Sequence, residues 1–159
     1  MRIKNSFLIL LIAIAFCSCD KKRVFDEYKS VGSAWHKDSI ISFDLPILDS
    51  TKRYDLFINL RDNNNYAYNN LFLIVTLEKP NGYTKVDTLE YEMAAPDGTL
   101  LGEGFTDIKE SKLFYKEGVR FRGKYKVNIK QAVRESGKVP GVTQLEGITD
   151  IGLRIEKKE

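Results

Sequence analysis

Three groups of side chains have types and spacings that could support chemistry. The first contains His36, the single histidine, which lies two residues before Asp38 as in a His/Asp relay. No recognisable motif places a nucleophile beside this pair, however. The sequence therefore favours an exposed histidine over a catalytic one.

The second group is a set of carboxylates in the segment 86–93. Glu90 and Glu92 share one face of the expected strand, and Asp87 is close to Glu90 in sequence. A glycosidase pair also needs one carboxyl group in an apolar pocket, which spacing alone does not indicate. A solvated strand face is the better interpretation, so we expect no catalytic residues and no enzyme.

The third group is the segment 62–70, DNNNYAYNN, which begins like a calcium-binding loop. It fails at the third ligand position and has no Glu at the twelfth, so we expect no metal site. Two interpretations remain open. Asn tolerates left-handed turn conformations, which favours a long hairpin loop. Alternatively, amphipathic tyrosines and amides could contact a protein or a glycan, and the candidate patch is Tyr66, Tyr68, Asn63, Asn64 and Asn69.

The elements that must position these side chains are short strands. Apolar and polar residues alternate with a period of two, which predicts one half-buried strand after another, and Pro-Asn-Gly and Pro-Asp-Gly sequences mark turns. The segment Leu71 to Glu78 is almost wholly apolar and predicts a central strand covered on both faces. Gln131 to Gly137 predicts one or two helical turns with a Gly cap. The expected strands are residues 40–45, 53–61, 71–78, 86–93, 113–121, 125–130 and 148–156.

This pattern predicts an all-β protein with a single antiparallel β-sandwich domain, Ig-like or jelly-roll-like, and the alternative fold is an open barrel. Removal of Arg2 and Lys4 with a signal peptide leaves 23 Lys and Arg against 22 Asp and Glu. So balanced a charge argues against nucleic-acid binding, which requires a strongly basic face. We also expect no small-molecule substrate and no cofactor.

The N-terminus has the layout of a secretory signal peptide: a short basic stretch, the apolar run Phe7 to Phe16, and small residues. The run is half as long as the roughly 20 residues needed to cross a bilayer as a helix. In bacterial lipoprotein signals a small residue precedes the acylated cysteine, and only Cys19, after Ser18, fits. We therefore expect a covalent lipid on Cys19, which leaves no cysteine for a disulfide. The basic cluster 20–23 either contacts anionic headgroups or starts a hydrophilic tether.

Several long stretches are similar to a known family. The lipobox-like start, Asp55 to Val75, Thr88 to Glu110, Gln131 to Lys138 and Leu145 to Ile155 resemble the gliding motility lipoprotein GldH family of Bacteroidetes. The resemblance implies a cell-envelope lipoprotein that is needed to assemble or run the gliding apparatus, which is linked in that phylum to type IX protein secretion. It brings no catalytic residues, and only the acylated cysteine carries over, onto Cys19.

The expected organisation follows. Residues 1–18 are a lipoprotein signal peptide, residues 19–35 a lipidated N-terminus and tether, and residues 36–159 the β-sandwich domain. The protein is expected to be a non-enzymatic scaffold or interaction module held to the membrane by lipid, with other gliding and secretion proteins of the envelope as partners. Its alternative function is envelope glycan binding. The basic residues after Cys19, in place of the acid-rich run associated with surface export, favour an outer-membrane anchor that faces the periplasm.

Overall fold

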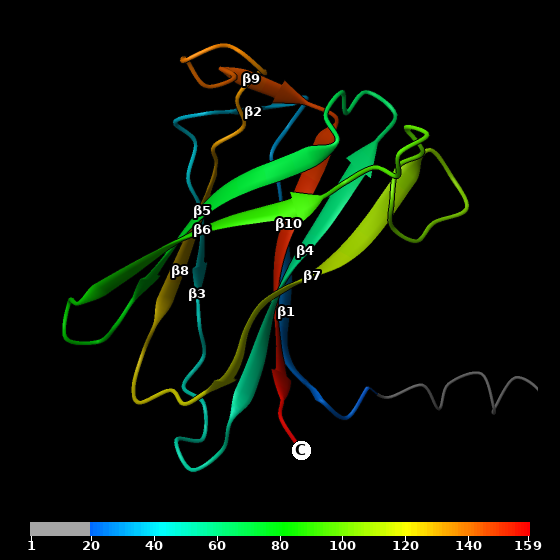
Figure 1. Cartoon of the computed structure of the whole chain (residues 1–159). Coiled ribbons are helices and arrows are strands. Elements are labelled where there is room, and N and C mark those ends of the chain that lie inside the picture. Colours follow the sequence, from blue (N-terminus) through cyan, green and yellow to red (C-terminus); the bar gives the residue numbers. More distant parts are fainter. Residues whose placement is uncertain (1–19) are drawn as a thin grey trace, which may run out of the picture.

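The computed structural model describes residues 20–159, which form two antiparallel four-stranded sheets and a short two-stranded ribbon (Figure 1). The order is β1-β10-β4-β7 in the first sheet and β3-β8-β5-β6 in the second, and β2 pairs with β9. The strands are β1 (Arg23–Ser30), β2 (Ala34–His36), β3 (Ile41–Asp44), β4 (Tyr54–Asn63), β5 (Asn70–Glu78), β6 (Thr84–Glu92), β7 (Ile108–Val119), β8 (Lys126–Gln131), β9 (Gln144–Glu146) and β10 (Ile148–Lys157). The all-β antiparallel prediction is confirmed.

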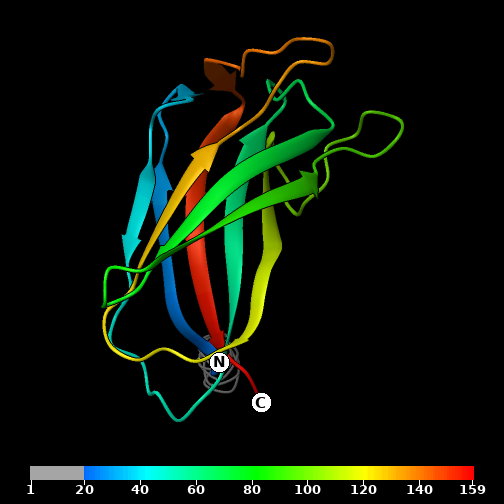
Figure 2. The ribbon, with the colours of Figure 1, turned by 60° about the vertical axis from the view of Figure 1, so that its left-hand side comes forward.

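The long strands run alternately in opposite directions, so the connections gather at two ends of the sandwich. One end carries residues 45–53, 79–83 and 120–125 together with residues 20–22 and the C-terminus (Figure 2). The other end carries residues 31–40, 64–69, 93–107 and 132–147, including the β2–β9 ribbon (Figure 1). We call them the terminal end and the loop end.

The core lies between the two sheets, where alternate residues of the facing strands meet. In β4, Leu56, Ile58 and Leu60 are fully buried, as their alternation predicts. Leu71, Leu73 and Val75 of β5 face them from the second sheet and are also fully buried. The inward sets that the sequence predicts therefore form one core.

The prediction of a tether over residues 19–35 is wrong for most of that segment. Residues 23–30 form β1, which pairs with β10 from Arg23 opposite Glu156 to Ser30 opposite Asp150. Trp35 is fully buried, and its indole nitrogen donates a hydrogen bond to the carbonyl of Ser39. The domain therefore begins before residue 36, because β1 completes the first sheet.

Two further expectations need correction. The outer face of β5 is not covered: Phe72 and Ile74 are only partly buried, whereas their neighbours Leu71 and Leu73 are fully buried. Residues 131–137 contain no helix; β8 ends at Gln131, and the chain turns at Gly137 with φ +76°. The side chain of Gln131 donates to the Val142 carbonyl and accepts from the Val133 amide, which holds this connection in an irregular conformation.

The predicted signal peptide, residues 1–18, and the predicted lipidation site, Cys19, lie outside the described residues. Within residues 20–159 the structure has no helix with the length and apolar character of a membrane span.

Candidate functional site

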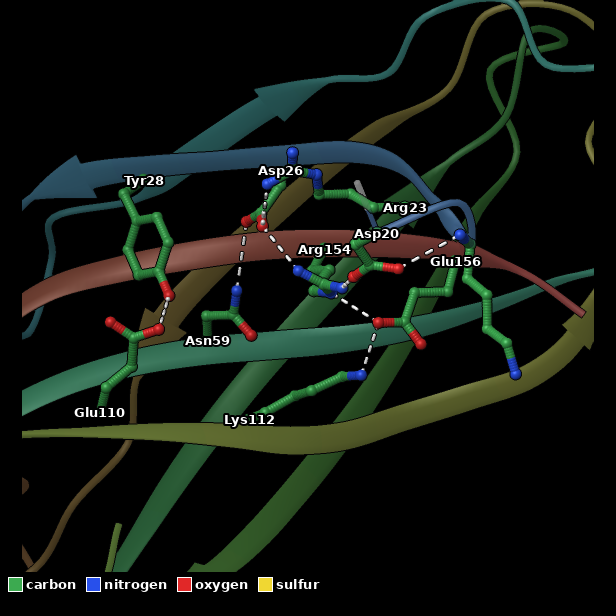
Figure 3. Close-up of polar contacts among 10 residues, drawn as sticks. Asp20, Arg23, Asp26, Tyr28, Asn59, Glu110, Lys112, Arg154 and Glu156 are labelled. Carbon is green, nitrogen blue, oxygen red and sulfur yellow. Dashed lines mark hydrogen bonds and ion pairs between the residues drawn. The ribbon is translucent and has the colours of Figure 1, made fainter. Parts of the chain in front are cut away.

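The outer face of the first sheet carries a network of charged side chains centred on Arg154 of β10 (Figure 3). The Arg154 guanidinium donates hydrogen bonds to Asp20, to Asp26 at 2.9 Å and to Glu156 at 2.6 Å. Lys112 of β7 approaches Glu156 from the other side at 2.5 Å. Four strands of one sheet are thus joined across their outer surface, since Asn59 of β4 also donates to Asp26 at 3.2 Å.

A second part of the network lies towards the loop end. Arg61 donates to Glu110 at 2.9 Å and stacks over the Tyr28 ring, 4.1 Å from its centroid. The Tyr28 hydroxyl donates to Glu110 at 2.9 Å (Figure 3). Gly152 of β10 makes room for this ring, because a Cβ there would lie 3.0 Å from two Tyr28 ring carbons. We call all these side chains the ionic network.

The ionic network shifts the pKa of Glu110, Glu156 and Arg154 towards their charged forms. Burial raises the pKa of Glu156, but hydrogen bonds from Lys112 and Arg154 outweigh it, so the pKa lies below its ordinary value. The pKa of Glu110 is lowered in the same way by Arg61 and Tyr28, again against burial. Burial opposes the charge of Arg154 as well, yet its acidic partners raise its pKa. These ions are satisfied by one another, which is the arrangement of a structural network.

The outer face of the second sheet is different in kind. Phe72 and Ile74 of β5 lie beside Glu90 and Thr88 of β6, and Ile74 also lies opposite Lys130 of β8. Val86, further along β6, is 60% exposed. The result is a strip with an apolar middle, an acidic edge and a basic edge, which we call the outer strip. Its members are Phe72, Ile74, Val86, Thr88, Glu90, Glu92, Lys130, Ala132 and Arg134.

The tyrosines and asparagines of the predicted patch do not form one surface. Tyr66 is 5% exposed; its hydroxyl donates to the Asn70 carbonyl at 2.7 Å, so it fixes the loop from inside. Tyr68 packs edge-on against it with ring centroids 5.8 Å apart and is half-buried. Asn69 is exposed beside Tyr68, whereas Asn63 and Asn64 line a different hollow, near Asp107.

Tyr68 and Asn69 line an open hollow of about 940 Å³ where the outer strip reaches the loop end. Phe72 forms part of its wall, and Glu90, Glu92 and Arg134 supply charged groups. The hollow combines one aromatic ring, an amide and charges of both signs. Such a set of side chains can bind polar ligands, and no pair in it forms a nucleophile with its base.

The fold separates Asp87 from Glu90, whereas Glu90 and Glu92 both line the hollow beside Tyr68. Asp87 accepts hydrogen bonds from Tyr115 and Lys116 on β7, where it closes the side of the sandwich. Glu90 accepts from Asn70 at 2.9 Å on the outer face. The Nδ1 atom of His36 accepts a hydrogen bond from the Asp38 amide, a local turn contact. Among residues 20–159, no three His, Cys, Asp or Glu side chains are grouped as metal ligands.

Asp62, the first residue of the segment that begins like a calcium-binding loop, is a buried carboxylate at the end of β4. It is 0% exposed, and neither carboxylate oxygen has a hydrogen-bond partner within the described residues. Burial raises its pKa to about 6, although Lys109 lowers it. The alternation of Leu56, Ile58 and Leu60 already puts Asp62 on the inward face, a signal that could have identified it.

Comparison with known proteins places these features in a family. The model of the family described as GldH lipoprotein matches residues 23–155. "Gliding motility lipoprotein GldH" of Flavobacterium johnsoniae is 77% identical over 159 residues, all of both chains. "Gliding motility lipoprotein GldH homolog" of Christiangramia forsetii is 57% identical over 155 residues, which is 96% of this chain and 95% of that protein.

Among solved structures, the infectious bursal disease virus VP2 subviral particle matches with a TM-score of 0.33 and 14% identity. The match covers 87% of this chain and 34% of the viral chain, and so distant a likeness carries no argument. The family match spans β1 to β10 and is supported by full-length relatives. The chain therefore belongs to the GldH lipoprotein family.

Proposed function

We propose that this chain is a lipid-anchored protein of the cell envelope that serves the gliding apparatus as a non-enzymatic interaction module. The observation that carries the proposal is the 77% identity, over the whole chain, to a protein named for gliding motility and for its lipid. The structure supports the non-enzymatic part, because the charged groups of the ionic network pair with one another.

The proposed anchor is a lipid on Cys19. The apolar run before Cys19 and Ser18 at the preceding position support this anchor. The sandwich also lies close to Cys19 in sequence, since β1 begins at Arg23. Three acyl chains would hold the protein permanently, because a single chain binds only marginally. Asp20 to Arg23, which lacks an acidic run, supports attachment to the outer membrane with the domain in the periplasm. A domain in the periplasm could also contact the proteins of type IX secretion.

Replacing Cys19 by Ala in gliding cells tests the anchor. We expect the Cys19→Ala protein to appear in the soluble fraction and gliding to stop, whereas Cys17→Ala should remain membrane-bound and functional. Intact-mass measurement of the wild-type protein should show a cleaved chain that carries acyl groups at residue 19. A wild-type N-terminus that is uncleaved and unmodified contradicts the anchor.

The proposed contact surface is the outer strip, and its occupant is another protein of the gliding apparatus. β5 presents apolar side chains outward on a face that the described chain leaves exposed, and exposed apolar patches of this kind mark partner contacts. The strip has carboxylates along one edge and cations along the other. A partner that fits it presents an apolar ridge with the opposite order of charges, which fixes the orientation of binding.

Matched substitutions on the two outer faces test this surface. Val86→Asp alters the outer strip, and Phe114→Asp alters the first sheet at a side chain of similar exposure, 53% against 60%. We expect Val86→Asp to abolish gliding with normal protein abundance, while Phe114→Asp still glides. Gliding by the Val86→Asp cells at the wild-type rate would exclude the outer strip.

Glycan binding is the second candidate function, and the hollow beside Tyr68 favours it. The half-buried Tyr68 next to Asn69, Glu90 and Arg134 offers a ring and hydrogen-bonding groups, as sugars require. Arrays of envelope polysaccharides probed with residues 20–159 decide between the two, with Tyr68→Ala as the control that should lose any signal. Silence on every polysaccharide ends this candidate and leaves the protein partner.

A further inference from the structure

The terminal end of the sandwich is strongly basic although the chain as a whole is nearly neutral. Its connecting segments contain nine cations and only three side-chain carboxylates. Within the described residues, ion pairs engage three of these cations, Lys22, Lys52 and Lys158. The nine cations are Lys21, Lys22, Lys52, Arg53, Lys79, Arg120, Arg122, Lys124 and Lys158, and the carboxylates are Asp20, Asp49 and Glu159.

The loop end has the opposite sign. Its segments contain three cations, Lys37, Arg134 and Lys138, against six carboxylates. The strands between the two ends have up to ten residues, or twelve in β7, so the ends are about 30 Å apart. The separation exceeds the Debye length of about 8 Å at physiological salt, so each end presents its own charge to its surroundings.

The chain enters the sandwich at the basic end, and only residues 20–22 lie between residue 19 and β1. Asp20 forms hydrogen bonds to Arg154, and β1 starts at Arg23. If residue 19 carries the lipid, as proposed above, residues 20–22 span at most about 10 Å, which is close to the Debye length. The nine cations would therefore lie within electrostatic reach of the headgroups.

Exposed apolar side chains accompany the cations. Ile47 is 71% exposed and Tyr83 is 58% exposed on two connections of the terminal end, and Lys79 lies over the Tyr83 ring at 4.7 Å. Tyrosine is enriched at membrane–water interfaces, and lysine is attracted to anionic headgroups. Apolar exposure alone does not distinguish the ends, because Phe105 and Val139 are also exposed at the loop end. The charge does.

We propose that the terminal end docks flat on an anionic bilayer surface, with the loop end directed away from the membrane. The proposal rests on the proposed lipid anchor, which brings this end to the headgroups, and adds a second attachment that fixes the orientation of the domain. Each cation near an anionic surface contributes to binding, and the contributions add. The surface consists of the connections 45–53, 79–83 and 120–125, with Lys21 and Lys22.

The first test uses the chain from Asp20 to Glu159, which retains every core residue between Trp35 and Ile155. Circular dichroism and thermal unfolding are first measured to check that this chain is folded before vesicles are added. We expect sedimentation with vesicles of phosphatidylcholine and phosphatidylglycerol, weak binding to phosphatidylcholine alone, and loss of binding in high salt. The triple variant Arg120→Ser, Arg122→Ser, Lys124→Ser should reduce the partition coefficient about 100-fold.

A matched triple variant at the loop end provides the control. Lys37→Ser, Arg134→Ser, Lys138→Ser removes the same charge, and we expect less than about a threefold change because that end lies beyond the Debye length. Equal losses in the two triple variants mean that net charge alone drives adsorption. That result, or equal binding to neutral and anionic vesicles, overturns the proposal.

The second test reports orientation. Tyr83→Trp at the terminal end and Val139→Trp at the loop end each add an exposed tryptophan to the buried Trp35. On vesicles that contain phosphatidylglycerol and brominated lipid, quenching is expected for the residue 83 variant and not for the residue 139 variant. The reverse pattern refutes the docked orientation.

The two proposals fail in different ways. If the full-length protein is extracted from cells only by detergent while residues 20–159 ignore anionic vesicles, the lipid anchor stands and the docking surface falls. If Cys19→Ala remains on the membrane in cells and leaves it in high salt, the docking surface stands and the lipid anchor falls.

Discussion

The two outer faces of the sandwich carry different kinds of side chain. On the first sheet, Arg154, Glu156 and Asp26 compensate one another, and little of their charge remains for a partner. On the second sheet, Phe72 and Ile74 face outward beside side chains that do not cover them. A face whose charged side chains pair with one another contributes to stability. A face with partly exposed apolar side chains can still bury them against a partner. Substitutions on each face test this difference.

The largest effect is expected from neighbouring residues of β5. Leu73 is fully buried, so Leu73→Ala should lower the free energy of unfolding by about 3 kcal/mol through lost burial and a cavity. Ile74 lies on the outer strip, and Ile74→Ala should cost less than about 1 kcal/mol. Urea denaturation of both variants measures the difference. Similar losses would show that the outer strip is packed like a core.

The second largest loss of folding stability is expected from a substitution in the ionic network. Arg154→Leu leaves Asp20, Asp26 and Glu156 without their shared donor on a surface where the arginine side chain is only 16% exposed. We expect a loss of about 2 kcal/mol, below the value for a fully buried pair. Arg122→Leu, an exposed residue of the β7–β8 connection, is the control and should stay within about 0.5 kcal/mol of wild type.

Asp62 shows what happens when this fold does not partner a carboxylate. Its pKa is raised to about 6 from an ordinary 3.8, so the folded state retains a proton that the unfolded state has lost between these values. Folding stability therefore falls as pH rises through this window and is lowest above it. Asp62→Asn should flatten this dependence and stabilise the protein by about 2 kcal/mol at neutral pH.

Denaturation midpoints at several pH values measure this effect. The network carboxylates have the opposite sign: because the pKa of Glu110 and of Glu156 is lowered, their stabilisation is lost as pH falls through the acidic range. Asp62→Asn should leave that acidic limb unchanged. If the stability of Asp62→Asn depends on pH as that of the wild type does between about pH 4 and 6, the assignment of the raised pKa is wrong.

The smallest effect concerns the rim of the network. Lys112 contacts Glu156 and lies 4.0 Å from the centroid of the Phe57 ring, but it is 45% exposed. Lys112→Met keeps the aliphatic contact and removes the charge, which should cost about 0.5 kcal/mol. The loss should shrink in high salt, since exposed pairs are screened. A loss that is independent of salt would point to packing instead.

The sequence predicts the strands whose alternation is strong. The alternation predicts the correct faces of β4 and β10, because Leu and Ile recur at every second residue. β1, RVFDEYKS, was missed since its charged residues lack that contrast, and its stability comes from pairing with β10, more than 120 residues away. The apolar run of β5 predicted burial on both faces, but composition does not reveal whether a covering layer exists.

The site was less predictable than the fold. The ionic network joins Asp26 to Arg154 across most of the chain, and no local spacing indicates such a contact. Tyr66 and Tyr68, two residues apart in one loop, look equivalent in sequence. Only the approach of Gly147 to the backbone of Tyr66 shows why one is buried: a Cβ at Gly147 would lie 2.2 Å from the Tyr66 nitrogen. Backbone proximity of this kind arises from tertiary structure.

The pairing of β1 with β10 has a mechanical consequence. If Cys19 carries the proposed lipid, a pull on the anchor enters at Asp20 and runs along the axis of β1 while the rest of the sheet resists it. The hydrogen bonds of an antiparallel ladder lie across the strands, so such a pull loads the whole β1–β10 ladder in shear instead of peeling it one bond at a time. On that proposal, a pull on the anchor would load the β1–β10 ladder in shear, and Arg154, bound to Asp20 and Asp26, would lie where the pull arrives.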